Sequence, residues 1–258
     1  MTKVLSFGDR IRPGDYTLHS RFSRAVNFMR QGRLASVVAP AVGGGPINIV
    51  MAGCDLSSLS RLEVADGSFS LDGESFPKSP LFDSRPPKPR GLDLRQLREL
   101  LLRKAHPKSL AFLLDSRRCR NLASGFESAL VRRLQEAARS LRRGDLEAGA
   151  KAARGAGLGL TPSGDDLLCG YLWGLHLRGA GSAQDVERVY AQAQGQNPLS
   201  SAFLDCAREG RFFAPLKELM AEPSEARLDA VLASGETSGA DTCVGLILAL
   251  DKEEPLWS

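Results

Sequence analysis

The chain has 258 residues, of which 43% are hydrophobic and 25% are charged, and its formal net charge is +4. No apolar run approaches the roughly 20 residues that span a membrane, and the first residues lack the apolar core of a secretory signal. The five cysteines include no Cys-x-x-Cys pair, which argues against a disulfide framework and a zinc site. We therefore expect a cytoplasmic protein with reduced thiols.

The first part of the chain has the composition of strands. Residues 34–40, 47–53 and 61–73 are short, rich in β-branched residues or alternating in polarity, and Asp66-Gly67 is a hairpin-turn sequence. One helix is predicted over residues 20–32, where apolar residues recur at helical spacing and a glycine follows as a stop signal. We predict a small, mostly-β N-terminal domain over residues 1–84.

A proline-rich segment over residues 76–91 separates this part from the rest, because proline removes a backbone donor and fixes φ. Beyond it nearly every segment has helical periodicity and ends at glycine or before proline. The fold class is therefore α+β, with a larger α-helical domain over residues 91–258. The excess of Arg and Lys between residues 85 and 143 is typical of solvated helix faces, with a surface for acidic small molecules or a partner subunit as the alternative.

A helix-entrance motif occurs twice, as SGDDLLCG at residues 163–170 and as SGADTCVG at residues 238–245. In each copy Ser-x-x-Asp has the spacing of a capping box, in which the hydroxyl accepts from an amide one turn on and the acid reaches back. Gly170 and Gly245 lie inside the helices, where glycine costs about 1 kcal/mol relative to alanine. We predict that the two helices cross on these small residues and that their starts face a common pocket.

Such a pocket combines helix-start amides, which attract anions, with carboxylates, which attract cations and N–H donors. The candidates for catalysis are the three acids Asp165, Asp166 and Asp241. The candidates for substrate binding are Thr161, Ser163, Gly164, Thr237, Ser238 and Gly239. Two alternatives stay open: the carboxylates hold Mg²⁺ through oxygen ligands, or the motif only caps and packs helices.

Two weaker candidates for substrate binding lie in the N-terminal part. His19, just before the predicted helix, could act as a base or contact a ligand, although a capping and packing role is the simpler interpretation. Asn27 could reach a ligand if its helix face turns inward, but asparagine is common on helix surfaces.

The two motifs, within GLTPSGDDLLCG and GETSGADTCVGLIL, resemble the signatures of the bacterial family of the AllH-type subunit of oxamate carbamoyltransferase. LHSRFSRAVNF and SSAFLDCAREGRF extend the resemblance, while Ala156 and Leu158 depart from the family pattern. The resemblance implies transfer of a carbamoyl group between oxalurate and phosphate, giving oxamate and carbamoyl phosphate, in purine or allantoin nitrogen breakdown. It also implies two partners, an acyl-CoA-synthetase-like subunit and a further carbamoyltransferase subunit.

Two other functions remain as alternatives. Acidic residues at helix starts are similar to the helical motifs of ADP-ribosyl-glycohydrolases, which hold two Mg²⁺ ions and act as hydrolases. The other alternative is a non-catalytic scaffold subunit, in which the repeated motif packs helices or contacts partners.

Overall fold

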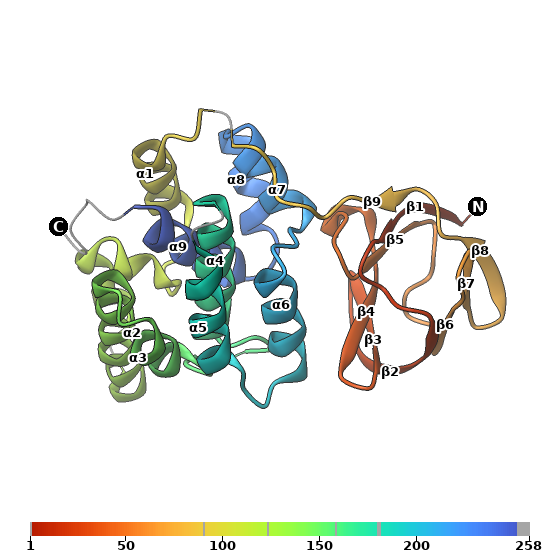
Figure 1. The fold of residues 1–258 in the computed structure, drawn as a ribbon, viewed down its shortest axis with the longest axis horizontal. Coiled ribbons are helices and arrows are strands. Elements are labelled where there is room, and N and C mark those ends of the chain that lie inside the picture. The colour runs from red at the N-terminus through yellow and green to blue at the C-terminus, as the bar shows by residue number, and fades with distance from the viewer. Residues whose placement is uncertain (1, 90, 123, 158, 180–181, 252–258) are drawn as a thin grey trace. The chain divides into compact units, whose positions relative to one another are not determined.

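A computed structural model describes residues 2–89, 91–122, 124–157, 159–179 and 182–251. The chain divides into two compact units. The first consists of the residues up to Arg85 together with Arg211–Ala214, and the second consists of Pro86–Gly210 and the residues from Pro215 onward. Strands make up the first unit and helices the second, so the predicted α+β class is confirmed in this broad form (Figure 1).

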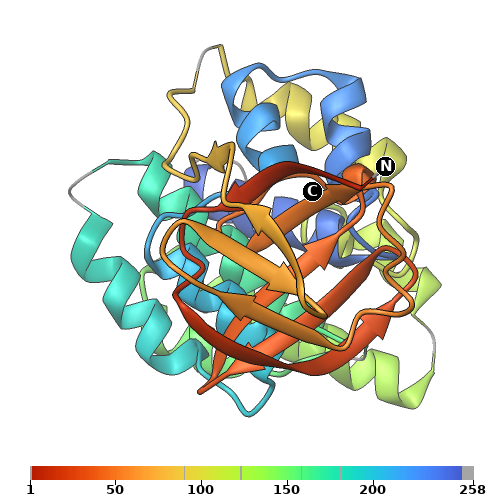
Figure 2. The same cartoon turned by 90° about the vertical axis from the view of Figure 1, so that its right-hand side faces the viewer.

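The first unit is a nine-stranded sheet in the order β8-β7-β6-β2-β3-β4-β5-β1-β9, which curls around its core (Figure 2). The pairs β4–β5 and β1–β9 are parallel, and the other neighbours are antiparallel. The strands are β1 (Lys3–Gly8), β2 (Gly14–Phe22), β3 (Ala25–Arg30), β4 (Arg33–Val38), β5 (Asn48–Ala52), β6 (Arg61–Val64), β7 (Ser68–Leu71), β8 (Glu74–Pro77) and β9 (Leu81–Phe82). A short 3-10 helix, η1 (Pro40–Val42), precedes β5.

The core of this unit contains the apolar side chains that alternate along the strands, such as Val26 and Phe28 of β3, which are both 0% exposed. The predicted turn at Asp66-Gly67 is confirmed, because β6 and β7 pair on either side of it in antiparallel register.

The helix predicted over residues 20–32 is wrong. This segment is a strand pair, with Arg21 of β2 opposite Val26 of β3, and β3 also pairs with β4. The predicted glycine stop is a turn residue: Gln31 and Gly32 both have positive φ, at 49° and 76°, as the tight turn of a two-residue hairpin requires. Neighbouring strands on both sides of β3 satisfy its backbone, and this long-range pairing overrides the local helical spacing.

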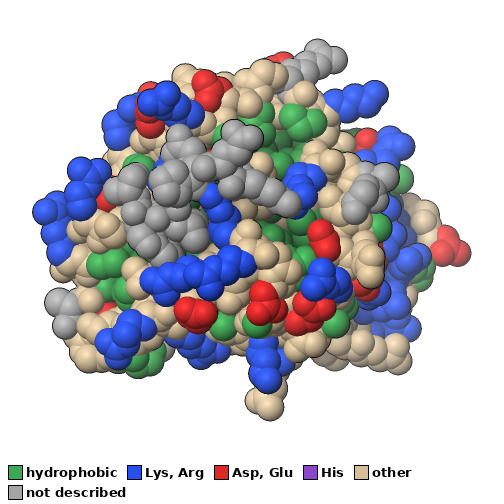
Figure 3. All heavy atoms as spheres, turned by 60° about the vertical axis from the view of Figure 1, so that its left-hand side comes forward, with side chains coloured by type: hydrophobic (Ala, Val, Ile, Leu, Met, Phe, Trp, Pro, Cys, Tyr) green, Lys and Arg blue, Asp and Glu red, His purple; other side chains and the backbone are tan. Residues whose placement is uncertain are grey.

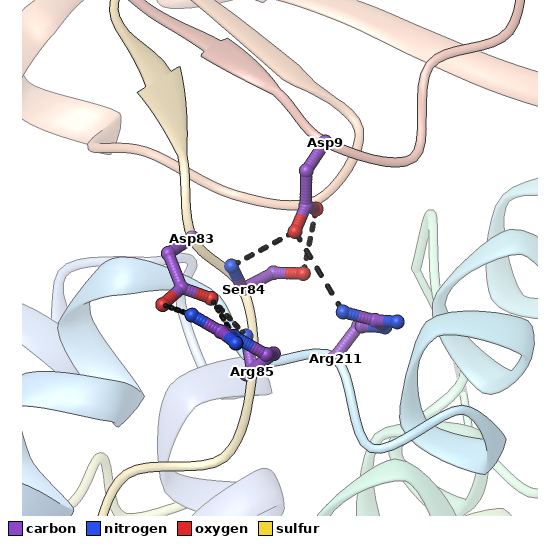
Figure 4. A network of polar contacts seen from close by, with 5 residues as sticks. All are labelled: Asp9, Asp83, Ser84, Arg85 and Arg211. Atoms are coloured by element: carbon purple, nitrogen blue, oxygen red, sulfur yellow. Dashed lines mark hydrogen bonds and ion pairs between the residues drawn. The ribbon is translucent and has the colours of Figure 1, made fainter.

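A polar network holds the returning segment Arg211–Ala214 to the first unit (Figure 4). The carboxylate of Asp9 accepts from the Ser84 amide at 3.1 Å and from the Ser84 hydroxyl at 2.6 Å, and it pairs with Arg211 at 3.7 Å. The amide of Phe212 in turn donates to the Ser84 carbonyl at 2.8 Å. Two chain segments more than a hundred residues apart in sequence are thereby fixed to one loop of the sheet unit.

The helices of the second unit follow the segments predicted from periodicity. They are α1 (Leu94–Lys104), η2 (Leu110–Leu113), η3 (Ser116–Asn121), α2 (Gly125–Arg143), α3 (Leu146–Ala153), α4 (Ser163–Leu177), α5 (Ala183–Ala193), α6 (Pro198–Arg208), α7 (Ala214–Ala221), α8 (Glu225–Leu232) and α9 (Ser238–Leu250). Figure 3 shows basic side chains spread over one face of the molecule with acidic ones among them. Pairs such as Lys108–Glu127 at 3.0 Å and Arg139–Glu136 at 3.4 Å fit the prediction of solvated helix faces.

The predicted crossing of α4 and α9 on small residues is confirmed. A Cβ atom added to Gly170 would lie 1.9 Å from the Thr242 carbonyl oxygen, and one added to Gly245 would lie 1.9 Å from the Leu167 carbonyl oxygen. Each glycine therefore admits the backbone of the other helix. The two helices are buried along most of their length, as expected for helices that are apolar on all sides.

The motif glycines at the helix starts repeat this relationship with the preceding helices. A Cβ added to Gly164 of α4 would lie 2.0 Å from the Ala153 carbonyl oxygen at the end of α3. One added to Gly239 of α9 would lie 2.1 Å from the Val231 carbonyl oxygen in the last turn of α8. The two copies thus share a local structure, in which a short helix closes onto the start of a buried one.

We predict that Gly245→Ala lowers the free energy of unfolding by about 1–3 kcal/mol, because the new methyl group has no space against the α4 backbone. The matched control is Gly125→Ala in the first turn of α2, where an added Cβ meets nothing within 4 Å. This control is expected to be neutral or slightly stabilising. Urea unfolding of both variants checks the prediction, and equal stabilities would contradict it.

Candidate functional site

The starts of α4 and α9 meet, so residues from the two copies of the motif lie side by side. The Thr161 hydroxyl donates to Oδ2 of Asp166 at 3.0 Å, and the Thr161 and Ser238 hydroxyl oxygens are 3.4 Å apart. Both hydroxyl residues are half-buried, whereas Asp166 is 8% exposed and Asp241 is 0% exposed. The structure therefore brings together buried acids and partly accessible hydroxyls from segments far apart in the sequence.

The two predicted capping boxes do not form. Ser163 and Ser238 are the first helical residues, so the N-caps are Pro162 for α4 and Thr237 for α9. Neither N-cap makes a side-chain hydrogen bond to the helix. Two polar interactions cross between the copies instead. The Ser238 side chain acts on the Asp166 carboxylate and lowers its pKa, and the Ser163 side chain does the same to Asp241.

The helix-start amides of α4, which the sequence suggested as ligands for anions, donate hydrogen bonds to backbone carbonyl groups. The Gly164 amide donates to the Ala156 carbonyl at 2.7 Å, and the Asp165 amide donates to the Pro162 carbonyl at 2.9 Å. The role of Gly164 in binding substrate oxygens stays a prediction. The hydroxyl groups of the two helix starts are the other candidate donors.

Asp165 stabilises a loop. Its side chain is 3% exposed, and its Oδ1 accepts from the Gly155 amide at 2.7 Å, directly after α3. A charge-assisted hydrogen bond of this kind fixes the path of the chain between α3 and α4. The catalytic role assigned to Asp165 is without support from this contact and stays a prediction.

Asp166 is buried beside another acid. Burial, and after it the negative charge of Asp241, raises the pKa of Asp166 to about 8, while Ser238 and Thr161 act in the opposite direction. The charge of Asp165 raises it slightly further. At neutral pH this carboxyl group therefore keeps a proton that an exposed aspartate would lose.

Asp241 accepts a backbone hydrogen bond from another part of the unit. The Leu110 amide of η2 donates to its Oδ1 at 2.6 Å, and burial raises the pKa of Asp241 to about 7 despite this bond. The polar side chains of Ser163 and Thr237 lower it. Its second oxygen, Oδ2, is buried and has no hydrogen-bond partner among the described residues. The sequence does not indicate Leu110 as a site residue, because its main-chain amide makes the contact and its side chain is apolar.

The residues that the structure describes include no group of three or more His, Cys, Asp or Glu side chains placed to hold a metal ion. Of the three motif acids, Asp165 is engaged by the Gly155 amide, which leaves the buried pair Asp166 and Asp241. The geometry gives no support to the two-Mg²⁺ alternative.

His19 and Asn27 belong to the first unit, whereas the motif residues belong to the second. Contrary to prediction, both lie on strands: His19 on β2 is exposed, and Asn27 on β3 is 7% exposed. Asn27 donates to the Ser20 hydroxyl at 3.1 Å and accepts from the Ser36 hydroxyl at 2.7 Å. Asn27 thus bridges three neighbouring strands, and its part in substrate binding stays a prediction, as does that of His19.

The raised pKa values predict a pH-dependent stability. The folded protein binds protons at Asp166 and Asp241 that the unfolded chain, with an ordinary pKa near 3.8, has released. The free energy of unfolding should therefore fall as pH rises from about 4 to about 8, by up to about 1.4 kcal/mol per pH unit for each group. Asp166→Asn should flatten this slope. Urea unfolding across the range checks it, and identical slopes for both proteins would refute the prediction.

Comparison with known protein families gives a match to part of the chain. No solved structure matches the chain, and no described helix is long and apolar enough to cross a membrane. Residues 154–250 match the model of a family described as oxamate carbamoyltransferase subunit AllH. The matched segment includes the buried Ala156 but not residues 18–28 of the resemblance, and Leu158 lies outside the described residues. The match covers less than half of the chain, and it includes both starts of the crossed helices.

Proposed function

We propose that this chain is a subunit of a carbamoyltransferase of the oxamate type, and that the joined starts of α4 and α9 bind its small substrate. The observation that carries the proposal is the buried pair Asp166 and Asp241 beside hydroxyl groups from both helix starts. The pair lies inside the segment that matches the family.

The chemistry of the site suits ureido compounds. Carboxyl groups accept hydrogen bonds from ureido N–H groups, and the hydroxyls of Thr161, Ser163, Thr237 and Ser238 donate to carbonyl, carboxylate or phosphate oxygens. These are the groups of oxalurate, oxamate, carbamoyl phosphate and phosphate, which we propose as the ligands. Catalysis would consist mainly of positioning and charge stabilisation in a largely dehydrated site.

The family description is of a subunit, so we propose that this chain acts in an assembly. Its partners would be an acyl-CoA-synthetase-like subunit and a further carbamoyltransferase subunit, working in the cytoplasm in purine or allantoin nitrogen catabolism. His19 and Asn27 stay candidate substrate contacts.

We expect Asp166→Asn to reduce carbamoyl transfer by the assembled complex by about a hundredfold or more, because asparagine cannot exchange a proton. The measurement is the phosphate-dependent rate of carbamoyl transfer, with circular dichroism showing that the variant is folded. The matched control is Asp145→Asn, an exposed helix cap of α3 at which asparagine serves equally well. A folded Asp166→Asn complex with the full rate would refute the assignment.

A scaffold role is the second candidate, and one observation favours it. Asp165 and Asp241 each hold a backbone amide of another segment, Gly155 and Leu110, which is a structural task. The two functions differ in what happens when this chain is left out of the assembly. If the remaining subunits transfer the carbamoyl group at the full rate without this chain, the scaffold role is supported. If transfer is lost and adding the Asp166→Asn chain does not restore it, the substrate site is supported.

A further inference from the structure

The first turn of α6 contains a buried hydroxyl group that the site has not yet used. Ser200 is 3% exposed, and its Oγ has no hydrogen-bond partner among the described residues. A serine buried inside a helix can donate to the carbonyl group four residues earlier. Ser200 is only the third residue of α6, so the residue four positions earlier, Gln196, precedes the helix. A buried hydroxyl without a partner is unfavourable, which makes Ser200 a candidate ligand contact.

The Asn197 side chain joins this turn of α6 to the loop before α4. Its Oδ1 accepts from the Ser200 amide at 3.1 Å, and its Nδ2 donates to the Leu160 carbonyl at 2.7 Å. Leu160 directly precedes Thr161, whose hydroxyl donates to Asp166 at 3.0 Å. A single side-chain amide therefore connects the backbone of Ser200 with the neighbour of a site residue.

Helix α6 packs against α4, and the two helices run in the same direction (Figure 1). Their starts are joined through Asn197, and their ends are joined by the His176 ring, whose Nε2 lies 2.8 Å from the Arg208 carbonyl oxygen. Packed helices with adjacent starts have their first turns at the same level. The first turn of α6, with Ser200, therefore lies beside the first turn of α4, with Asp166.

Ser200 lies on the buried side of α6. Leu204 and Ala207, which follow it at helical spacing, are both 0% exposed. Asp205, on the other side of the helix, is exposed and accepts from the Tyr190 hydroxyl of α5. The Ser200 hydroxyl therefore points into the interior of the second unit, away from solvent and from this contact with α5.

We propose that the Ser200 hydroxyl is a further substrate-binding group, which donates a hydrogen bond to an oxygen of the ligand at the starts of α4 and α9; this role rests on the proposed function. Every ligand named there carries a carboxylate or a phosphate group, and a hydrogen bond to a charged acceptor is stronger than one to a neutral group. Helix α6 then forms a third side of the site. Residues 200–212, which extend the family resemblance, thereby gain a role in binding.

The test compares Ser200→Ala with Ser201→Ala, a matched control because Ser201 is the next residue of the same helix and is half-buried. The Tm of each full chain is measured without ligand, and carbamoyl transfer by the assembled complex is measured while oxalurate and phosphate are varied in turn. We expect Ser200→Ala to keep the Tm of the unaltered protein, because the hydroxyl that it removes has no partner. It should raise the KM for one of the two substrates about tenfold, and that substrate carries the oxygen that Ser200 contacts.

Ser201→Ala should change neither the Tm nor either KM. Two results would overturn the inference while carbamoyl transfer by the unaltered complex stands. In one, the complex with Ser200→Ala has unchanged KM values for both substrates, which leaves the hydroxyl no part in binding. In the other, Ser200→Ala lowers the Tm, which means that the hydroxyl stabilises the fold. If the unaltered complex transfers no carbamoyl group, the proposed function itself fails, and this role of Ser200 fails with it.

Discussion

The close approach of α4 and α9 is the contact on which the rest of the site depends. Gly170 and Gly245 each admit a carbonyl of the opposite helix, where any side chain would hold the backbones apart. Helix axes in ordinary contact are 8–10 Å apart, a distance set by the side chains between them. Without side chains at the crossing, the first turns of both helices also come together, and this joins Thr161 to Ser238.

Close packing of the helices places two acids in a buried environment, where charge is expensive. A helix start attracts negative charge, which explains why an acid is tolerated in the first turn of each helix. The dipole effect is small beside the loss of water around a buried carboxylate. The structure offsets part of this cost with the Leu110 amide and the Thr161 hydroxyl, and the raised pKa values of both acids reflect the part that is not offset.

The sequence allowed the helical unit, the repeated motif and the glycine crossing to be predicted, because each depends on local pattern and on the absence of a side chain. The prediction of capping boxes was wrong because Ser-x-x-Asp spacing does not show which residue is the N-cap, and Pro162 takes that position in α4. A helix was predicted in place of the β2–β3 strand pair because the apolar spacing of this segment fits a helix as well as a strand. Neither the Leu110 amide nor the return of Arg211–Ala214 to the first unit has a compositional signature, since both are set by tertiary structure.

The two copies of the motif differ in a way that bears on their chemistry. Asp166 and Asp241 occupy equivalent places, but Asp165 in the first copy corresponds to Ala240 in the second. Their hydrogen bonds differ too, because a hydroxyl donates to Asp166 and a main-chain amide donates to Asp241. An amide held by η2 is a fixed donor, whereas the Thr161 hydroxyl can rotate toward another acceptor. The repeat therefore pairs a rigidly bound carboxyl group with an adaptable one.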